Sequence, residues 1–185
     1  LFKSWQLEVG KKIILFPGRL TAWKGQEMFL ESLNKVNTHL GHEAFIAVIL
    51  GSQQGRDLYK KKLIRLVEQY RLNNQVKFIE HCKKMPLAYK ICHLVVSASI
   101  EPEAFGRVSV EAQSMQKPIL ASNIGGSNET VINDKTGFLY EAGNSEEMSK
   151  KIIEILNLEE NTLKQMGIEG RKNVINKFNV EKMCF

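Results

Sequence analysis

Two glutamates eight positions apart are the first residues whose spacing points to chemistry. They are Glu103 and Glu111, in the stretch EPEAFGRVSVEAQ from Glu101 to Gln113. A helix that begins at the Phe-Gly step between them would offer free N–H groups to a phosphate. A carboxylate that accepts hydroxyl hydrogen bonds is one way to hold a ribose. The structural alternative is also open: Glu111 would pair with Arg107 for about 0.2–0.5 kcal/mol, and Glu103 would complement the helix dipole.

A second group of suitable residues lies in PGRLTAWKGQ, from Pro17 to Gln26. Gly18 permits close approach of the backbone, Arg19 offers a planar fork to phosphate oxygens, and Lys24 adds a mobile point charge. Just before a predicted helix, these groups suit a diphosphate. The alternative is a surface loop with two solvated cations. The sequence does not decide whether Trp23 packs inside or contacts a ligand.

Two glycine-rich turns are weaker candidates. GSQQG, which begins at Gly51, would let a ligand pass close to the backbone, and SNIGGSNETV, from Ser122 to Val131, would cradle another part of it. Each of them is equally well explained as a plain turn.

The elements that must position these residues alternate between short apolar strands and helical segments. Phe29, Leu33, Val36 and Leu40 recur at helical spacing, whereas AFIAVIL is a continuous apolar run. This alternation predicts a parallel sheet with helices on both faces, a doubly wound α/β fold. Such folds bind ligands at the carboxyl ends of the strands, which is where the candidate loops fall. Strands are expected at 12–16, 44–50, 76–79, 93–99, 118–122 and 137–140, and helices at about 26–40, 58–70, 86–91, 106–115, within 125–131, after the capping residue Asn144, and at about 163–176.

The composition is that of one globular domain, here taken as residues 1–185. The net charge of +6 suits an anionic partner, but the lysines are too scattered to indicate nucleic acid. No apolar run approaches the roughly 20 residues of a membrane span, and no signal peptide pattern is present. Three cysteines, Cys82, Cys92 and Cys184, favour reduced thiols in a cytoplasm. Because the chain does not begin with Met, we expect it to be part of a longer one.

Several classes of site are disfavoured by missing motifs. No G-x-G-x-x-G fingerprint follows a strand, and no G-x-x-x-x-G-K-[ST] loop is present, which argues against a dinucleotide-binding fold of the dehydrogenase type and against a P-loop. The chain has two aspartates, Asp57 and Asp134, and no Asp-x-Asp pair to chelate a metal–diphosphate. The His81-Cys82 and Cys92-His93 pairs match no zinc spacing. We therefore expect neither a cofactor nor a metal.

Taken together, the motifs resemble the carboxyl-terminal half of retaining glycosyltransferases of GT-B architecture, family 4, also called glycosyl transferases group 1. GRLTAWKG resembles the family's diphosphate loop, EAFGRVSVE its E-x₇-E motif, and KPILASNIGGSNETV with KTGFLY the segment that follows. The resemblance runs from about Ile13 to Phe178. It implies a Rossmann-like domain, one half of a GT-B enzyme.

The resemblance also implies roles for individual residues. Arg19 and Lys24 would hold the diphosphate of a nucleotide sugar, with Gly18 and Gly51 in the donor loops. Glu111 would bind the ribose, and Glu103 would lie beside the reacting sugar. The backbone around Phe105, Gly106 and Arg107 would contact the sugar and the distal phosphate. Family members often have a glycine after the third strand, where this chain has Glu80-His81-Cys82. Because that loop tends to contact the base of the nucleotide, the identity of the base stays open.

The implied activity is metal-independent hexosyl transfer with retention of configuration, in lipopolysaccharide or other surface glycan synthesis. The implied partners are the nucleotide sugar and an amino-terminal acceptor domain, without which the chain should not turn over. The implied location is cytoplasmic, with a peripheral contact on the inner face of the membrane.

Other functions remain as alternatives. The chain would also fit a non-catalytic nucleotide-sugar-binding module or a GT-B-like epimerase. A phosphorylase is disfavoured because no lysine is singled out for pyridoxal, and a nucleic-acid binder because cations and aromatics do not cluster.

Overall fold

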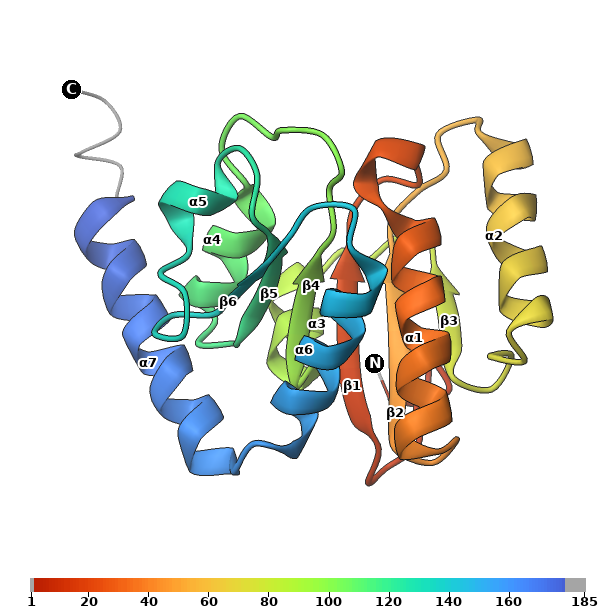
Figure 1. Cartoon of the computed structure of the whole chain (residues 1–185), viewed down its shortest axis with the longest axis horizontal. Coiled ribbons are helices and arrows are strands. Elements are labelled where there is room, and N and C mark those ends of the chain that lie inside the picture. Colours follow the sequence, from red (N-terminus) through yellow and green to blue (C-terminus); the bar gives the residue numbers. More distant parts are fainter. Residues whose placement is uncertain (1, 179–185) are drawn as a thin grey trace.

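The protein is described by a computed structural model that covers residues 2–178 (Figure 1). Residues 1 and 179–185, among them Cys184, lie outside the described part. The predicted fold class is confirmed: six parallel strands form one sheet, and helices cover both of its faces. The strands are β1 (Lys12–Pro17), β2 (Phe45–Leu50), β3 (Val76–Ile79), β4 (Leu94–Ser97), β5 (Ile119–Ser122) and β6 (Phe138–Tyr140). The helices are the 3-10 turn η1 (Ala22–Lys24), α1 (Gln26–Leu40), α2 (Asp57–Gln69), α3 (Met85–Ile91), α4 (Arg107–Ser114), α5 (Ser127–Thr130), α6 (Ser145–Asn157) and α7 (Glu160–Lys177).

The strand order is β3-β2-β1-β4-β5-β6. The chain enters at the centre with β1, moves outward to β3, and then returns to place β4 on the other side of β1. β1 pairs with β2 over its whole length, from Lys12 opposite Phe45 to Pro17 opposite Leu50, and with β4 at Ile14 and Leu15. The winding direction therefore reverses between β1 and β4.

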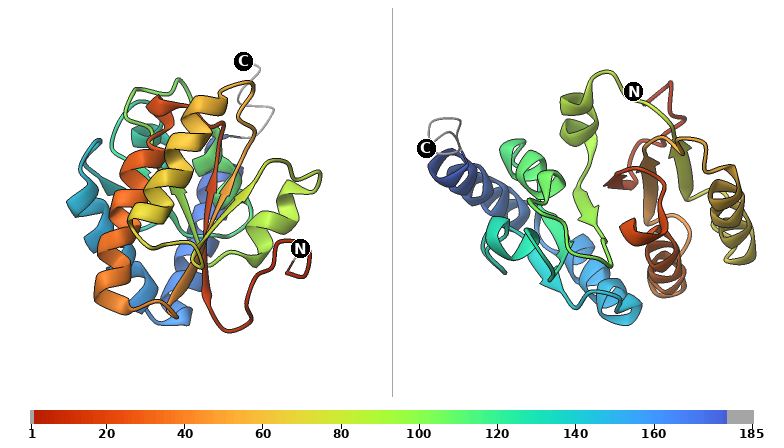
Figure 2. Two further views of the ribbon diagram at one scale, coloured as in Figure 1. Left: turned by 90° about the vertical axis from the view of Figure 1, so that its right-hand side faces the viewer. Right: turned by 90° about the horizontal axis from the view of Figure 1, so that it is seen from above.

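The central strands are almost entirely apolar, apart from Lys12 at the start of β1 and Ser97 at the end of β4, because both faces of the sheet are covered. In β1, Ile14 and Phe16 join the core under α1, α2 and α6, whereas Ile13 and Leu15 join the core under α3 and α4. This is the two-residue alternation of a strand that is buried on both sides. Seen from above, α1 and α2 lie on one side of the sheet and α3 on the other (Figure 2), and α7 packs on α4.

The sequence-based element boundaries agree with the structure to within about three residues. The predicted cap is confirmed: Asn144 Oδ1 accepts a hydrogen bond from Glu147 N at 2.9 Å. The reciprocal half of a capping box does not form, because the Glu147 carboxylate accepts instead from Glu141 N at 2.8 Å. The last helix begins at Glu160, three residues before its predicted start at Leu163.

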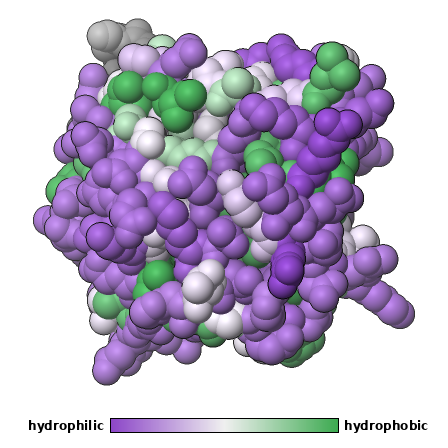
Figure 3. Space-filling view, turned by 45° about the vertical axis from the view of Figure 1, so that its right-hand side comes forward, coloured by the Kyte–Doolittle hydropathy of each residue, from purple (hydrophilic) through white to green (hydrophobic). Residues whose placement is uncertain are grey.

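The surface is predominantly hydrophilic on the side shown in Figure 3, with apolar side chains gathered in several small patches. Among the described residues no helix is both long and apolar enough to cross a membrane.

Candidate functional site

The candidate site lies where the sheet changes its winding direction. The loops after β1 and β4 leave adjacent strands at the same edge and turn toward opposite faces. In open α/β sheets the crevice at such a switch point is the usual place for a ligand. Arg19 and Lys24 are in the first loop, and Glu103 is in the second.

The two loops are held together by backbone contacts. Ile100 N donates to Trp23 O at 2.8 Å. Gly25 has a φ of 77°, and a Cβ there would lie 2.0 Å from the carbonyl oxygen of Ala98. A glycine is therefore required at position 25, both by the left-handed backbone and by the close approach of the β4 loop.

The central contact of the site is an ion pair across the switch point. Lys24 Nζ lies 2.7 Å from Glu103 Oε1, and their side chains are only 12% and 17% exposed. Ser99 Oγ donates a hydrogen bond to the same carboxylate oxygen. The Lys24 ammonium also lies 4.4 Å from the centre of the Trp23 ring, within the range of a cation–π contact. Two residues that are 79 positions apart in the sequence are thus fixed side by side, and the ammonium is held in one place.

This arrangement leaves unpaired positive charge for an anion. The Lys24 ammonium has three N–H donors, of which Glu103 takes one. The Arg19 side chain is exposed, and among residues 2–178 its guanidinium has no hydrogen-bond or ion-pair partner. Its backbone is fixed instead, because Gln26 Nε2 donates to Arg19 O at 2.8 Å. Gln26 in turn accepts from the Tyr59 hydroxyl at 3.2 Å, so a buried network positions the loop.

The start of α4 provides a second set of donors. Gly106 is the N-cap, with a φ of 69°, and the first N–H groups of the helix have no partner within it. The β5 turn supports this loop, because Gly126 N donates to Glu103 O at 2.7 Å. Phe105 is half-buried and the Arg107 side chain is exposed. The helix start and the ion pair therefore belong to one loop.

Glu111 is held by a residue that the sequence analysis did not single out. The Tyr89 hydroxyl donates to Glu111 Oε2 at 2.7 Å. Tyr89 is buried on α3, and its burial together with the Glu111 carboxylate raises the pKa of its phenol far above the usual value. The alternative in which Glu111 pairs with Arg107 is not what the structure shows: no such ion pair occurs among the described residues. A tyrosine in a short apolar helix looks like a packing residue, so the sequence carried no signal for this contact.

The remaining predicted residues line the loops around this centre. Gly18 N donates to Leu50 O at 2.9 Å, which continues the β1–β2 ladder into the loop. A Cβ at Gly51 would lie 1.9 Å from Gly18 O, so packing of the two loops already requires that glycine. In the unusual loop after β3, Glu80 forms an ion pair with Lys60 at 2.6 Å, and this contact lowers the pKa of the Glu80 carboxyl. Within residues 2–178, no three His, Cys, Asp or Glu side chains lie together in a way that could hold a metal.

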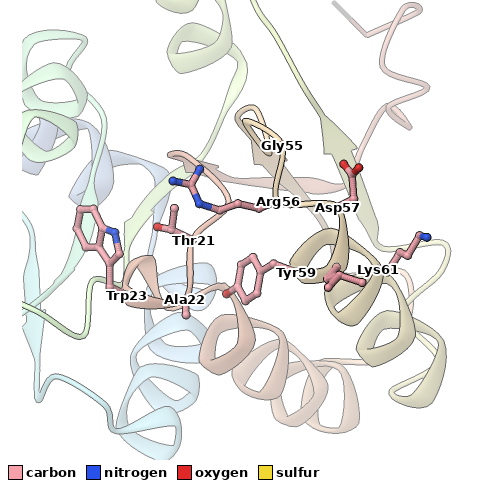
Figure 4. Close-up of a pocket in the computed structure, with 9 residues that line it drawn as sticks. Thr21, Ala22, Trp23, Gly55, Arg56, Asp57, Tyr59 and Lys61 are labelled. Carbon is pink, nitrogen blue, oxygen red and sulfur yellow. The ribbon is translucent and has the colours of Figure 1, made fainter.

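A cavity of about 820 Å³ adjoins the β1 loop, between η1 and the start of α2 (Figure 4). Trp23 lines this cavity, and the Lys24 ammonium lies 4.4 Å from the centre of the Trp23 ring.

The fold and the position of the site define a Rossmann-like domain of the kind found in GT-B glycosyltransferases. The chain belongs to the family Glycosyl transferases group 1, whose model matches residues 1–173.

Relatives and solved structures agree with this assignment. The capsular polysaccharide biosynthesis glycosyltransferase CapM of Staphylococcus aureus is 29% identical over 90% of this chain and 42% of its own length. A glycosyltransferase from Rickettsia africae superposes with a TM-score of 0.92 at 33% identity, over 98% of this chain and 47% of that one. Anabaena HepE, solved in complex with UDP-glucose, superposes with a TM-score of 0.85 at 28% identity, over 94% and 46%. The chain thus spans less than half the length of these proteins.

Proposed function

We propose that the chain forms the donor-binding half of a glycosyltransferase that uses a nucleoside-diphosphate hexose. In this proposal the sugar is transferred with retention of configuration and without a bound metal. The observation that carries it is the Lys24–Glu103 ion pair at the switch point of the sheet, beside the start of α4. The UDP-glucose complex of Anabaena HepE supports the choice of ligand class.

Each predicted residue has a task in this proposal. Arg19 and Lys24 bind the diphosphate, together with the N–H groups at Gly106 and Arg107. Glu111, oriented by the Tyr89 hydroxyl, accepts hydrogen bonds from the ribose. Glu103, held by Lys24 and Ser99, faces the sugar.

The chemistry follows from where charge develops. As the bond from the anomeric carbon to the diphosphate oxygen breaks, its electron pair goes to the diphosphate and the sugar becomes positive. Cations that are already fixed beside the leaving group stabilise this state more than the ground state. Lys24 is such a cation, because the ion pair and the Trp23 ring hold it before the donor arrives. The Glu103 carboxylate, which contacts that ammonium, would complement the positive charge on the sugar.

Metal independence has a physical basis in the same groups. The negative charge of a diphosphate would be balanced by Arg19, by Lys24 and by the positive end of the α4 dipole. Glu103 is already engaged by Lys24, which makes it a poor metal ligand in this arrangement.

The wider setting is also part of the proposal. We place the enzyme in surface glycan synthesis, such as that of lipopolysaccharide, in the cytoplasm with a peripheral contact on the inner membrane face. A second, acceptor-binding domain would complete the cleft. The capsular polysaccharide relative supports the pathway class, and the length of the solved relatives supports the second domain.

The test is a calorimetric titration of the chain with UDP, GDP and ADP in the presence of EDTA and, separately, of Mg²⁺. We expect one of them to bind in EDTA, and Arg19→Ala to weaken that binding by roughly 10–100-fold, since a hydrogen bond to a charged group contributes about 1.5–3 kcal/mol. Arg65→Ala, which removes an exposed arginine from α2, is the matched control and should bind as the wild type does. Binding that requires Mg²⁺, or equal affinity of the two variants, would contradict the proposal.

A further inference from the structure

The cavity beside the β1 loop has the size of a small-molecule site. It measures about 820 Å³, within the range of roughly 300–1,000 Å³ typical of ligand pockets. Its walls come from two segments: one runs from Thr21 into η1, and the other comprises the end of the loop before α2 and the first residues of α2. The lining residues are Thr21, Ala22, Trp23, Gly55, Arg56, Asp57, Leu58, Tyr59 and Lys61.

The cavity lies next to the proposed donor site, on the side away from the ribose. Trp23 lines it, and the ring of Trp23 lies 4.4 Å from the Lys24 ammonium that contacts Glu103. Helix α2 packs in the core on one face of the sheet, whereas Tyr89, which holds Glu111, packs in the core on the other. The α2 wall of the cavity and the Tyr89–Glu111 contact therefore belong to opposite faces of the sheet.

One wall of the cavity includes a residue whose polar side-chain atom has no partner among residues 2–178. Thr21 is 6% exposed, and its Oγ1 is buried without a hydrogen bond. A buried hydroxyl is normally satisfied, and it can both donate and accept. Because this oxygen has almost no accessible surface, it lies just beneath the cavity wall, and a turn of the Thr21 side chain would present it to a ligand group.

The opposite wall provides a mobile donor. The Arg56 side chain extends toward Thr21 and Trp23, whereas those of Asp57 and Lys61 extend away (Figure 4). The hydrogen bonds of Arg56 to Gln53 O and to Gln54 Oε1 are both 3.4 Å long, at the weak end of the range. The guanidinium is therefore aimed at the cavity and is loosely held.

Apart from Asp57 and Lys61, whose side chains extend away, the rest of the lining is apolar and aromatic. Trp23 and Tyr59 present ring surface, and Tyr59 uses its hydroxyl elsewhere, donating it to Gln26. Leu58, at the start of α2, is 83% exposed. An apolar ligand would leave Thr21 and Arg56 unpaired, and a phosphate would meet a single loosely held cation. A sugar ring matches both sets of groups, because its C–H face packs on aromatic rings and its hydroxyls bond to Thr21 and Arg56.

The geometry points to a carbohydrate subsite in this cavity, which binds a sugar ring of the acceptor beside the donor. This inference rests on the proposed function where it identifies the bound sugar as part of the acceptor. The binding of a sugar to the cavity can be tested without that assumption. The donor half would then contribute to acceptor recognition through Thr21, Trp23 and Arg56.

The two tryptophans of the chain provide the readout. Trp23 lines the cavity, whereas Trp5 is buried in the core on the other face of the sheet and serves as an internal reference. The ¹⁵N-labelled chain is titrated with the methyl glycosides of glucose, galactose, mannose and N-acetylglucosamine, each with and without saturating UDP-glucose. We expect at least one glycoside to shift the indole N–H signal of Trp23 and not that of Trp5, and the shift to persist with UDP-glucose.

Two cavity variants and one control sharpen the test. Arg56→Ala should raise the dissociation constant of that glycoside roughly tenfold, and Thr21→Val, which keeps the side-chain size, by about three- to tenfold. Arg65→Ala on the same helix should change nothing, and an unchanged Trp5 signal shows that each variant is folded. The inference is overturned if no glycoside shifts Trp23, if UDP-glucose displaces the glycoside, if inorganic phosphate gives the shift instead, or if both cavity variants bind like the wild type. Failure of nucleotides to bind in the calorimetric test would instead overturn the proposed function.

Discussion

The Lys24–Glu103 ion pair should contribute measurably to folding even without a ligand. Exposed ion pairs contribute about 0–1 kcal/mol, whereas breaking a fully buried pair costs about 3–5 kcal/mol. This pair lies between the two cases, since the side chains are 12% and 17% exposed. Glu103 also keeps its hydrogen bond from Ser99 when Lys24 is removed. We therefore expect Lys24→Met and Glu103→Gln each to lower the free energy of unfolding by about 2 kcal/mol.

The double variant Lys24→Met/Glu103→Gln isolates the interaction between the two side chains from their interactions with other residues. Once both charges are gone, no unpaired charge is left near the switch point, so the double variant should lose little more than either single one. The coupling energy is then about 1.5–2 kcal/mol, in the range expected for charged residues in direct contact. Urea denaturation followed by circular dichroism measures it, and each single variant should melt about 4–8 °C below the wild type.

A matched control uses an exposed pair of the same type. Lys62 Nζ lies 2.5 Å from Glu27 Oε2, with side chains 59% and 34% exposed. Lys62→Met should cost less than about 1 kcal/mol. The reasoning is refuted if Lys24→Met and Glu103→Gln are additive to within about 0.5 kcal/mol, or if Lys24→Met costs no more than Lys62→Met.

Three further outcomes are expected. Gly25→Ala should destabilise the domain by more than about 3 kcal/mol, because its Cβ would lie 2.0 Å from Ala98 O at a φ of 77°; a thermal melt within a few degrees of wild type would contradict this. Tyr89→Phe should weaken nucleoside-diphosphate binding about threefold by freeing Glu111, and calorimetry that finds unchanged affinity would remove Tyr89 from the site. Burial raises the pKa of the Cys92 thiol from 9.0 to about 12. The unfolded chain therefore releases this proton first, and the stability difference between the wild type and Cys92→Ala should fall as the pH rises from 9 to 12; a constant difference in urea titrations would count against it.

The helices and strands could be predicted because their signals are local. A strand buried on both faces must be apolar throughout, as FIAVIL in β2 is, and α1 shows its buried face as Phe29, Leu33 and Val36 at helical spacing. The cap at Asn144 is equally local. α7 was predicted to begin three residues late, because its first turn is polar and lacks a capping side chain.

The neighbours of the site residues could not be predicted in the same way. The contact between Lys24 and Glu103 forms because β4 lies next to β1 in the sheet. The order of the strands along the chain does not specify this neighbour. The hydrogen bond between Tyr89 and Glu111 depends on how α3 and α4 pack. From the sequence, an ion pair of Glu111 with Arg107 was an equally good prediction. The cavity at Thr21 and Arg56 depends on the approach of two loops that are 35 positions apart.

The sequence by itself determined the fold class, and it was enough to propose candidate loops whose residue types suit a diphosphate and a ribose. It could do so because hydrophobic periodicity specifies elements, and because parallel strands bring all their carboxyl ends to one edge. Only the tertiary structure decided which of those residues touch, since the free energy that selects partners comes from packing between distant segments. The ion pair of Lys24 with Glu103 forms because β1 lies beside β4, and the hydrogen bond of Tyr89 to Glu111 forms because α3 packs near α4.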